Sequence, residues 1–322
     1  MAVLFTGGTI SMEVDPVAGG ALPSLDGAAI LARTPDLDEI AEVVAIDWGL
    51  VPASHLGFGQ LLELARILAE VLKRPDIDGA VVVQGTDTIE ESSFAFDLLV
   101  PSDKPVVVTG AMRNAGEADY DGPRNLADAV RCAAAPALAG MGTLVVLNGL
   151  IVAADEAVKT HTTALDTFQP RDGEPVGRVV GRQVEVGGRR TPWTVLPGIP
   201  DRAAEPVHMV TAVAGMDGTL VRLLRPTRPA GLVVAATGAG NTHADLLTAS
   251  RELIDEGTPV VLTTRCASGR VHPTYAFPGG GATWQRAGAL LSGLSGPKAR
   301  VALALGLGAA LDQPALADLL RA

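Results

Sequence analysis

Short runs of β-branched and aliphatic residues alternate along this chain with longer stretches that have helical spacing. The runs expected to form strands are 2–5, 42–46, 80–84, 105–109, 143–147, 231–236 and 260–263. Apolar residues at helical spacing predict helices near 61–72, 125–134, 244–256, 298–311 and 314–320. This alternation is typical of βαβ units, in which helices cover both faces of a mainly parallel sheet.

The predicted fold class is α/β, with a larger N-terminal domain on a mainly parallel sheet and a smaller C-terminal α/β domain. At 322 residues the chain is too long for one small core, which favours two domains. The stretch 176–206 is rich in Gly, Pro and Arg and has no helical periodicity, so strands at its edges and a linker within it are expected. The predicted boundaries are 1–190 for the first domain, 191–208 for the linker and 209–322 for the second domain.

The uncharged segment 132–154 is long enough to suggest a membrane span. It is interrupted by Pro136, Gly140, Gly142, Asn148 and Gly149. These residues favour a helix end, a buried strand and a hairpin turn instead.

Composition narrows the function classes. A hydrophobic share of 48% with 19% charged residues indicates a globular protein. A formal net charge of −11 without a Lys/Arg cluster argues against nucleic-acid binding. Cys132 and Cys266 have neither disulfide-framework nor zinc-site spacing. A Gly-rich loop follows within a few residues of Met1, which leaves no room for a secretory signal, so the cytoplasm is the expected location.

Two threonine loops follow predicted strands. Thr6-Gly7-Gly8-Thr9-Ile10 follows the first strand, and Gly85-Thr86-Asp87-Thr88 follows the third. Sites in open α/β sheets form at the carboxyl ends of strands, where glycines expose backbone N–H groups and a hydroxyl could attack a carbonyl. The alternative is a pair of tight turns, with Thr9 or Asp87 as a helix cap. The first loop has neither the GxGxxG spacing nor the Lys of a phosphate-binding loop.

Lys159 follows an apolar stretch in the run Ala157-Val158-Lys159-Thr160-His161-Thr162-Thr163. A partly desolvated Lys can act as the base for a hydroxyl nucleophile or a water molecule. The alternative is a solvated surface lysine.

These motifs in this order resemble the bacterial L-asparaginase/glutaminase family. The resemblance covers the whole chain, because further segments also fit the family's sequence, namely 108–113, 121–126, 238–241 and 296–300. It implies a hydrolase that releases ammonia from L-asparagine, a small-molecule substrate, through a Thr acyl-enzyme. It implies no metal or organic cofactor, and it implies a homodimer or a homotetramer.

The resemblance also implies residue roles. Thr9 would be the acylated nucleophile, and Thr86, Asp87 and Lys159 would form the supporting catalytic group. Asp87 would also pair with the substrate's α-ammonium. The residues expected to bind substrate or hold the oxyanion through backbone N–H groups are Ser54, His55, Gly8, Gly85 and Ala111.

The chain departs from the family at three places. His55 stands where the family has Gln, and a capping Ser followed by an incidental His is the alternative interpretation of Ser54 and His55. Ala21 lies roughly where the family carries a lid Tyr, and Glu13 and Tyr275 are the candidates to replace that Tyr. The late loop 277–282 has no carboxylate, whereas the family draws an acidic residue from a neighbouring subunit there.

Three other functions remain open at this point. One is a glutaminase or a dual asparaginase/glutaminase, because these departures fall at positions expected to discriminate between the side-chain lengths of asparagine and glutamine. Another is the amidase part of a tRNA-dependent amidotransferase, which needs an extra domain. The third, of another class, is an amino-acid-binding sensor that has lost turnover.

Overall fold

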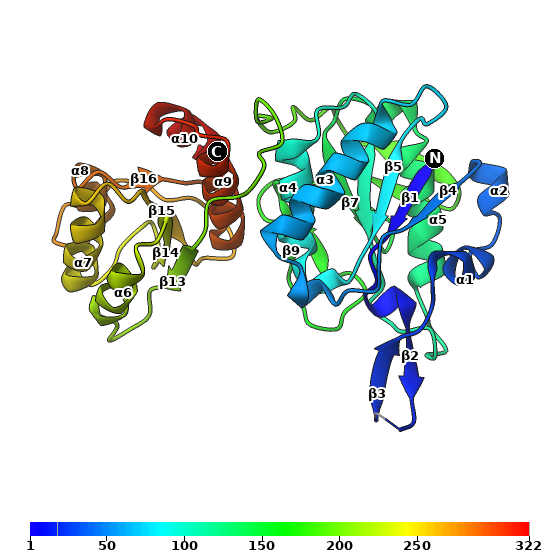
Figure 1. The fold of residues 1–322 in the computed structure, drawn as a ribbon, viewed down its shortest axis with the longest axis horizontal. Helices are drawn as coiled ribbons and strands as arrows, with labels where there is room; N and C mark the ends of the chain where they lie inside the picture. The colour runs from blue at the N-terminus through cyan, green and yellow to red at the C-terminus, as the bar shows by residue number, and fades with distance from the viewer. Residues whose placement is uncertain (18, 322) are drawn as a thin grey trace. The chain divides into compact units, whose positions relative to one another are not determined.

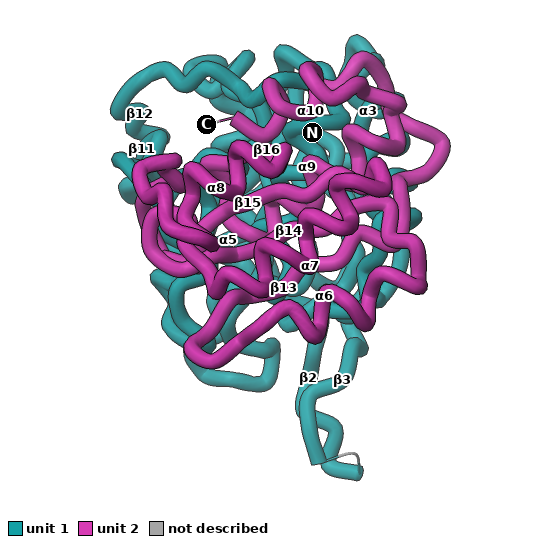
Figure 2. Tube along the Cα trace, turned by 90° about the vertical axis from the view of Figure 1, so that its left-hand side faces the viewer, with its two compact units in different colours: residues 1–195 teal, residues 196–322 magenta. Residues whose placement is uncertain are grey.

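The computed structural model describes residues 1–17 and 19–321. The chain divides into two compact units, Met1–Val195 (unit 1) and Leu196–Ala322 (unit 2), which are coloured separately in Figure 2. The division lies inside the segment 191–208, which the sequence suggests as a linker. Each unit has its own sheet and its own apolar core.

Unit 1 is built on an eight-stranded sheet with the order β12-β11-β8-β7-β6-β5-β1-β4. The strands from β7 to β4 in this order are parallel, whereas β8, β11 and β12 pair antiparallel. The strands are Ala2–Phe5 (β1), Val44–Asp47 (β4), Ala80–Val83 (β5), Val106–Thr109 (β6), Thr143–Leu147 (β7), Leu150–Ala153 (β8), Gly177–Val180 (β11) and Gln183–Val186 (β12). The strands β1, β5, β6 and β7 are buried along their whole length, as expected for parallel strands covered on both faces.

Helices cover both faces of this sheet (Figure 1). Val81 and Val83 of β5 belong to the core formed with α1, α2 and α5, and Val82 between them points to the face that carries α3 and α4. The helices of unit 1 are Gly27–Ala32 (α1), Leu37–Ile40 (α2), Phe58–Leu72 (α3), Ile89–Leu99 (α4) and Gly122–Ala133 (α5).

The direction of strand addition reverses at β1. The chain passes from β1 to its neighbour β4, crosses to β5 on the other side of β1, and then continues outward to β6 and β7. The loops after β1 and β5 therefore leave adjacent strands at the same edge of the sheet. Ligand sites in open α/β sheets form at such reversals.

Two hairpins lie outside the large sheet. Met12–Asp15 (β2) pairs with Gly20–Pro23 (β3) in an antiparallel hairpin that projects from unit 1 (Figure 1). Ala157–Lys159 (β9) pairs with Phe168–Pro170 (β10), so Lys159 stands at the end of a short strand.

Unit 2 contains a four-stranded parallel sheet in the order β13-β14-β15-β16. The strands are Val207–Thr211 (β13), Gly231–Ala236 (β14), Val260–Thr264 (β15) and Leu290–Leu291 (β16). The core of this unit includes side chains of Thr219–Leu224 (α6), Ala244–Asp255 (α7) and Gly281–Arg286 (α8). Gly296–Gly308 (α9) packs on β13, β14 and β15, and Gln313–Leu320 (α10) packs on α9.

The predicted fold class is confirmed: unit 1 has the large, mainly parallel sheet, and unit 2 is a smaller α/β unit. The hairpin expected in 132–154 is also present, because β7 and β8 are joined by Asn148 and Gly149 with φ values of 49° and 74°. Positive φ at both residues is typical of a tight two-residue hairpin loop. Among the described residues, no helix combines the length and the apolar character needed to cross a bilayer.

Candidate functional site

The loops after β1 and β5 meet through two glycines. Gly8 has a φ of 94°, and a Cβ placed on it would lie 2.1 Å from Gly85 N and 2.2 Å from Gly85 Cα. Only a residue without a side chain permits this approach. Thr6 also links the two strand ends, because its N–H and its Oγ1 both donate to Val83 O, at 2.9 and 3.2 Å. The two threonine loops therefore form one continuous surface.

Thr9 opens a 3-10 turn, Thr9–Ser11 (η1). The N–H and the Oγ of Ser11 both donate to Gly8 O, at 2.9 and 2.7 Å, and fix this turn. The turn is capped by Gly8 rather than by Thr9, so the capping interpretation of Thr9 is wrong. Thr9 is partly exposed, and no hydrogen bond engages its hydroxyl within the described chain.

Three of the predicted catalytic residues are joined directly. Lys159 Nζ donates to Thr86 Oγ1 at 2.9 Å and to Asp87 Oδ1 at 2.7 Å. Thr86 is buried, the Lys159 side chain is 15% exposed, and the Asp87 side chain is 69% exposed. Lys159 thus contacts a buried hydroxyl on one side and an open carboxylate on the other. Asp87 does not cap a helix, because Thr88 is the cap residue of α4.

Glu90 holds Lys159 in this position, a role that the sequence motifs did not indicate. Glu90 Oε1 accepts a hydrogen bond from Lys159 N at 2.8 Å and so ties the end of β9 to the first turn of α4. The only signal in the sequence is an acidic residue two positions after the second threonine loop.

Ser54 and His55 border the same loops. They belong to a 3-10 turn, Ala53–His55 (η2), whose Ala53 O accepts a hydrogen bond from Thr88 Oγ1 at 3.0 Å. Both are exposed, and Ser54 is not a helix cap, since α3 begins after Gly57. Their side chains can therefore meet a ligand placed above the threonine loops.

A third loop, after β6, completes the surface. Ala111 is fully buried there, and a Cβ on Gly110 would lie 3.2 Å from Thr86 Cγ2. The loop is fixed by Asp121, whose carboxylate accepts hydrogen bonds from the backbone N of Met112 and of Arg113, at 3.1 and 2.9 Å.

The two candidates for the missing lid Tyr lie in different units. Glu13 of β2 accepts hydrogen bonds from Arg33 Nη2 at 2.9 Å and from Ser24 Oγ at 3.1 Å. Arg33, and then Ser24, hold the pKa of the Glu13 carboxyl below its usual range. Tyr275 lies in unit 2, where its exposed ring packs against Phe277 with ring centroids 5.8 Å apart.

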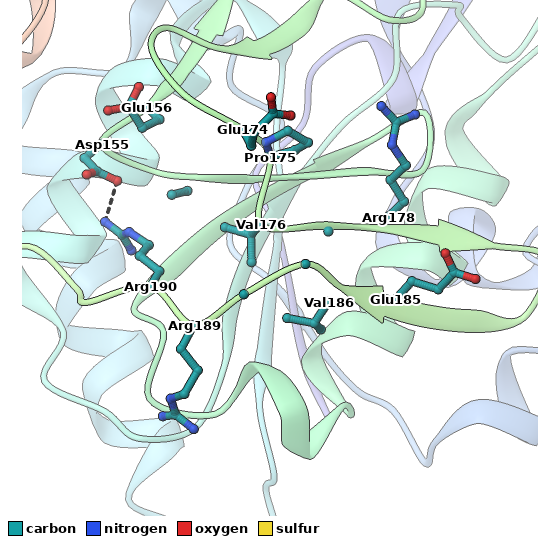
Figure 3. Close-up of a pocket in the computed structure, with 14 residues that line it drawn as sticks. Asp155, Glu156, Glu174, Pro175, Val176, Arg178, Glu185, Val186, Arg189 and Arg190 are labelled. Carbon is teal, nitrogen blue, oxygen red and sulfur yellow. Dashed lines mark hydrogen bonds and ion pairs between the residues drawn. The ribbon is translucent and has the colours of Figure 1, made fainter.

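A separate cavity of about 710 Å³ lies in unit 1 beside β8, β11 and β12. Its wall includes Arg190, which Figure 3 shows directed at Asp155, with Nη2 2.5 Å from Asp155 Oδ1. The same guanidinium is 2.8 Å from a buried oxygen of Asp97. Burial raises the pKa of Asp97, and Arg190 opposes that shift. None of the predicted site residues lines this cavity.

Within residues 1–17 and 19–321, no group of three or more His, Cys, Asp or Glu side chains is placed to hold a metal ion. The surface formed by the three loops instead offers hydroxyl groups, one amine, carboxylates and backbone N–H groups. Such a set suits attack on a carbonyl carbon by a hydroxyl.

Comparison with known proteins identifies the family of this chain. Residues 1–192 match the family described as "Asparaginase, N-terminal", and residues 206–320 match "Glutaminase/Asparaginase C-terminal domain". A probable L-asparaginase of Deinococcus radiodurans is 36% identical over 327 residues, covering 97% of this chain and 94% of the relative. One component of the Glutamyl-tRNA(Gln) amidotransferase of Archaeoglobus fulgidus is 28% identical, covering 84% of this chain and 65% of that protein.

Among solved structures, a probable cytoplasmic L-asparaginase from Campylobacter jejuni matches with a TM-score of 0.86 and 27% identity, covering 99% of this chain and 98% of that one. Both family matches together span most of the chain. The chain therefore belongs to the asparaginase family, and it is a hydrolase that acts on amides.

Proposed function

We propose that this protein hydrolyses the side-chain amide of L-asparagine to L-aspartate and ammonia through an acyl-enzyme on Thr9. The observation that carries the proposal is the position of Lys159 Nζ, 2.9 Å from the buried Thr86 hydroxyl. The loop that bears Thr86 touches the Thr9 loop through Gly85 and Gly8. An amine, a relay hydroxyl and an unengaged hydroxyl at one sheet edge are the groups that nucleophilic catalysis needs.

The reaction has two halves. Thr9 Oγ1 forms an ester bond with the amide carbon, its proton passes to the leaving nitrogen, and the C–N bond breaks to release ammonia. A water molecule then adds to the ester, one of its protons passes to Thr9 Oγ1, the bond to Thr9 breaks, and aspartate leaves. Thr86 and Lys159 would carry the proton in each half. Backbone N–H groups near Gly8, Gly85 and Ala111 would stabilise the oxyanion.

Substrate binding would use the exposed rim of the site. Asp87 Oδ1 is paired with Lys159, and no hydrogen bond engages Oδ2 in the described part of the chain, so this oxygen can accept the α-ammonium group. Ser54 Oγ and the His55 ring would donate to the α-carboxylate.

L-Glutamine is the second candidate substrate, alone or beside L-asparagine, because the chain also matches "Glutaminase/Asparaginase C-terminal domain". One extra methylene changes transition-state binding by about 1–3 kcal/mol, which corresponds to a preference of about 10–200-fold. The similarity to an amidotransferase component makes a tRNA-linked amide a further alternative. A non-catalytic sensor is the alternative of another class.

The test is ammonia release from L-asparagine and from L-glutamine by the wild type and by Thr9→Ala and Lys159→Met. Each substitution should lower kcat by about 10³-fold or more, because it removes a group that acts in the transition state. Thr194→Ala and Lys73→Met replace exposed residues outside the site and should leave turnover unchanged. Calorimetric binding of either amide without ammonia release would support the sensor and contradict hydrolysis.

We further propose that the protein assembles as a homodimer or homotetramer and acts in the cytoplasm. The family resemblance supports the assembly, and the cytoplasmic relative from Campylobacter jejuni supports the location. Light scattering of the purified protein would give the oligomer mass. A monomer that is fully active at low concentration would contradict the assembly.

A further inference from the structure

Tyr120 contacts the turn that carries Thr9 although it lies far away in the sequence. Its hydroxyl donates to Ile10 O at 2.6 Å, and Ile10 is the residue next to Thr9 in η1. The aromatic ring is held by packing, since a Cβ on Gly122 would lie only 2.5 Å from ring atoms of Tyr120. The hydroxyl is therefore presented to η1 in a fixed position.

The segment 110–121, which joins β6 to α5 and is named here the Tyr120 segment, makes a second contact with the same region. Ala115 N donates to Met12 O at 2.9 Å, two residues beyond Ile10. Two carbonyl groups within three residues of Thr9, those of Ile10 and Met12, are thus bound by the Tyr120 segment, one by a side chain and one by the backbone.

The other end of this segment reaches the chain after Lys159. Arg113 Nη1 donates to Thr163 O at 2.8 Å. Because Asp121 binds the backbone N of Met112 and of Arg113, the segment is internally fixed. It therefore connects the turn that bears Thr9 with the loop that follows Lys159.

The hydroxyl keeps its proton under ordinary conditions. Burial raises the pKa of Tyr120 to about 12, so the group is a hydrogen-bond donor throughout the neutral range. A donor held by packing can fix a backbone carbonyl more precisely than a side chain on a projecting hairpin.

We infer that Tyr120 is a positioning residue for Thr9: its hydroxyl holds the Thr9 turn, and the Tyr120 segment sets the place of Thr9 relative to Lys159. This inference rests on the proposed function. Tyr120 acts on the backbone beside Thr9 and not on the Thr9 hydroxyl. In this chain, which has Ala21 near the place of the family's lid Tyr, the nucleophile is supported through the backbone carbonyl of Ile10.

The test variant is Tyr120→Phe, which removes the hydroxyl and keeps the ring. It should lower kcat for L-asparagine by about 10-fold and change KM by less than about threefold, because a small misplacement of a nucleophile affects the transition state more than substrate binding. Arg113→Met should lower kcat in the same selective way, since it releases the other end of the segment.

The matched control is Thr34→Val. It removes another hydroxyl-to-carbonyl hydrogen bond of unit 1, from Thr34 Oγ1 to Ile30 O at 2.9 Å, between two residues that have no role in the proposed function. It should leave kcat unchanged even if it lowers stability. If Tyr120→Phe and Thr34→Val each reduce activity only in proportion to the fraction of unfolded protein, Tyr120 is merely structural and the inference is wrong.

A second readout is independent of activity. Amide hydrogen exchange at residues 9–14 should be faster in Tyr120→Phe than in the wild type and unchanged in Thr34→Val. Unchanged exchange in Tyr120→Phe would overturn the inference. An inactive Thr9→Ala beside a fully active Tyr120→Phe would also overturn it and leave the proposed function standing, whereas an active Thr9→Ala would overturn the proposed function.

Discussion

At the scale of single residues, the site combines groups that the sequence identifies with partners that it does not. The motifs singled out Thr9, Thr86, Asp87 and Lys159, and the last three are in direct contact. Tyr120, whose hydroxyl binds the carbonyl of Ile10, by contrast lies 110 residues further along the chain, and no local sequence pattern predicts such a contact. Roles carried by motifs could be predicted, and positioning contacts made by the tertiary fold could not.

The two cysteines should differ sharply in reactivity. Cys132 is fully buried in α5, and burial raises the pKa of its thiol to about 12, whereas Cys266 is exposed. Because the thiolate is the reacting form, an aromatic disulfide reagent at pH 8 should titrate one thiol quickly in the native protein and both in urea. Cys266→Ser should remove the fast reaction. Rapid labelling of Cys132 in the folded protein would contradict this prediction.

At the scale of elements, partners decide where strands end. The sequence predicts a strand at 42–46, but β4 is Val44–Asp47, because β4 is an edge strand that pairs with β1, and β1 begins at Ala2, opposite Val44. The hairpin of β2 and β3 was not predicted as strands. Met12–Asp15 alternates apolar and acidic residues over only four positions, and Gly20–Pro23 shows no alternation, so the pattern is too short to predict a hairpin.

The contact between the two threonine loops should tolerate no added side chain. Gly8→Ala combines a positive φ with overlap against Gly85, so it should lower the free energy of unfolding by about 2 kcal/mol or more and abolish most activity. Gly173→Ala has a positive φ of 81° but no atom within 4 Å of the new Cβ, so it separates the two causes. It should cost about 1 kcal/mol, measured by urea unfolding. Equal losses for both variants would show that crowding at Gly85 is unimportant.

At the scale of the whole molecule, the chain is two compact units with separate cores. The sequence suggested two domains because of chain length and because the stretch 176–206 lacks helical periodicity. The exact boundaries suggested for the domains and the linker, 1–190, 191–208 and 209–322, stay a prediction. Periodicity marks elements well, but a boundary depends on which residues share a core, and that is a property of the folded chain.

Unit 2 should fold by itself. Its four-stranded sheet and α6, α7 and α8 share one buried core, and α9 packs on three of its strands. A fragment of residues 196–322 should therefore show helix and strand signals by circular dichroism and a single cooperative thermal transition. It should release no ammonia, because the residues proposed for catalysis lie in unit 1. A fragment without a cooperative transition would contradict this prediction.

The contact between Gly8 and Gly85 also limits how this protein can change by mutation and selection. A Cβ on Gly8 meets backbone atoms of Gly85, and no substitution at position 85 removes backbone atoms. Therefore no second mutation, at position 8 or at position 85, can compensate for a side chain added at position 8. In a mutational library selected for turnover, position 8 should return glycine almost alone, while new specificities should be recovered at exposed neighbours such as Ser54 and His55.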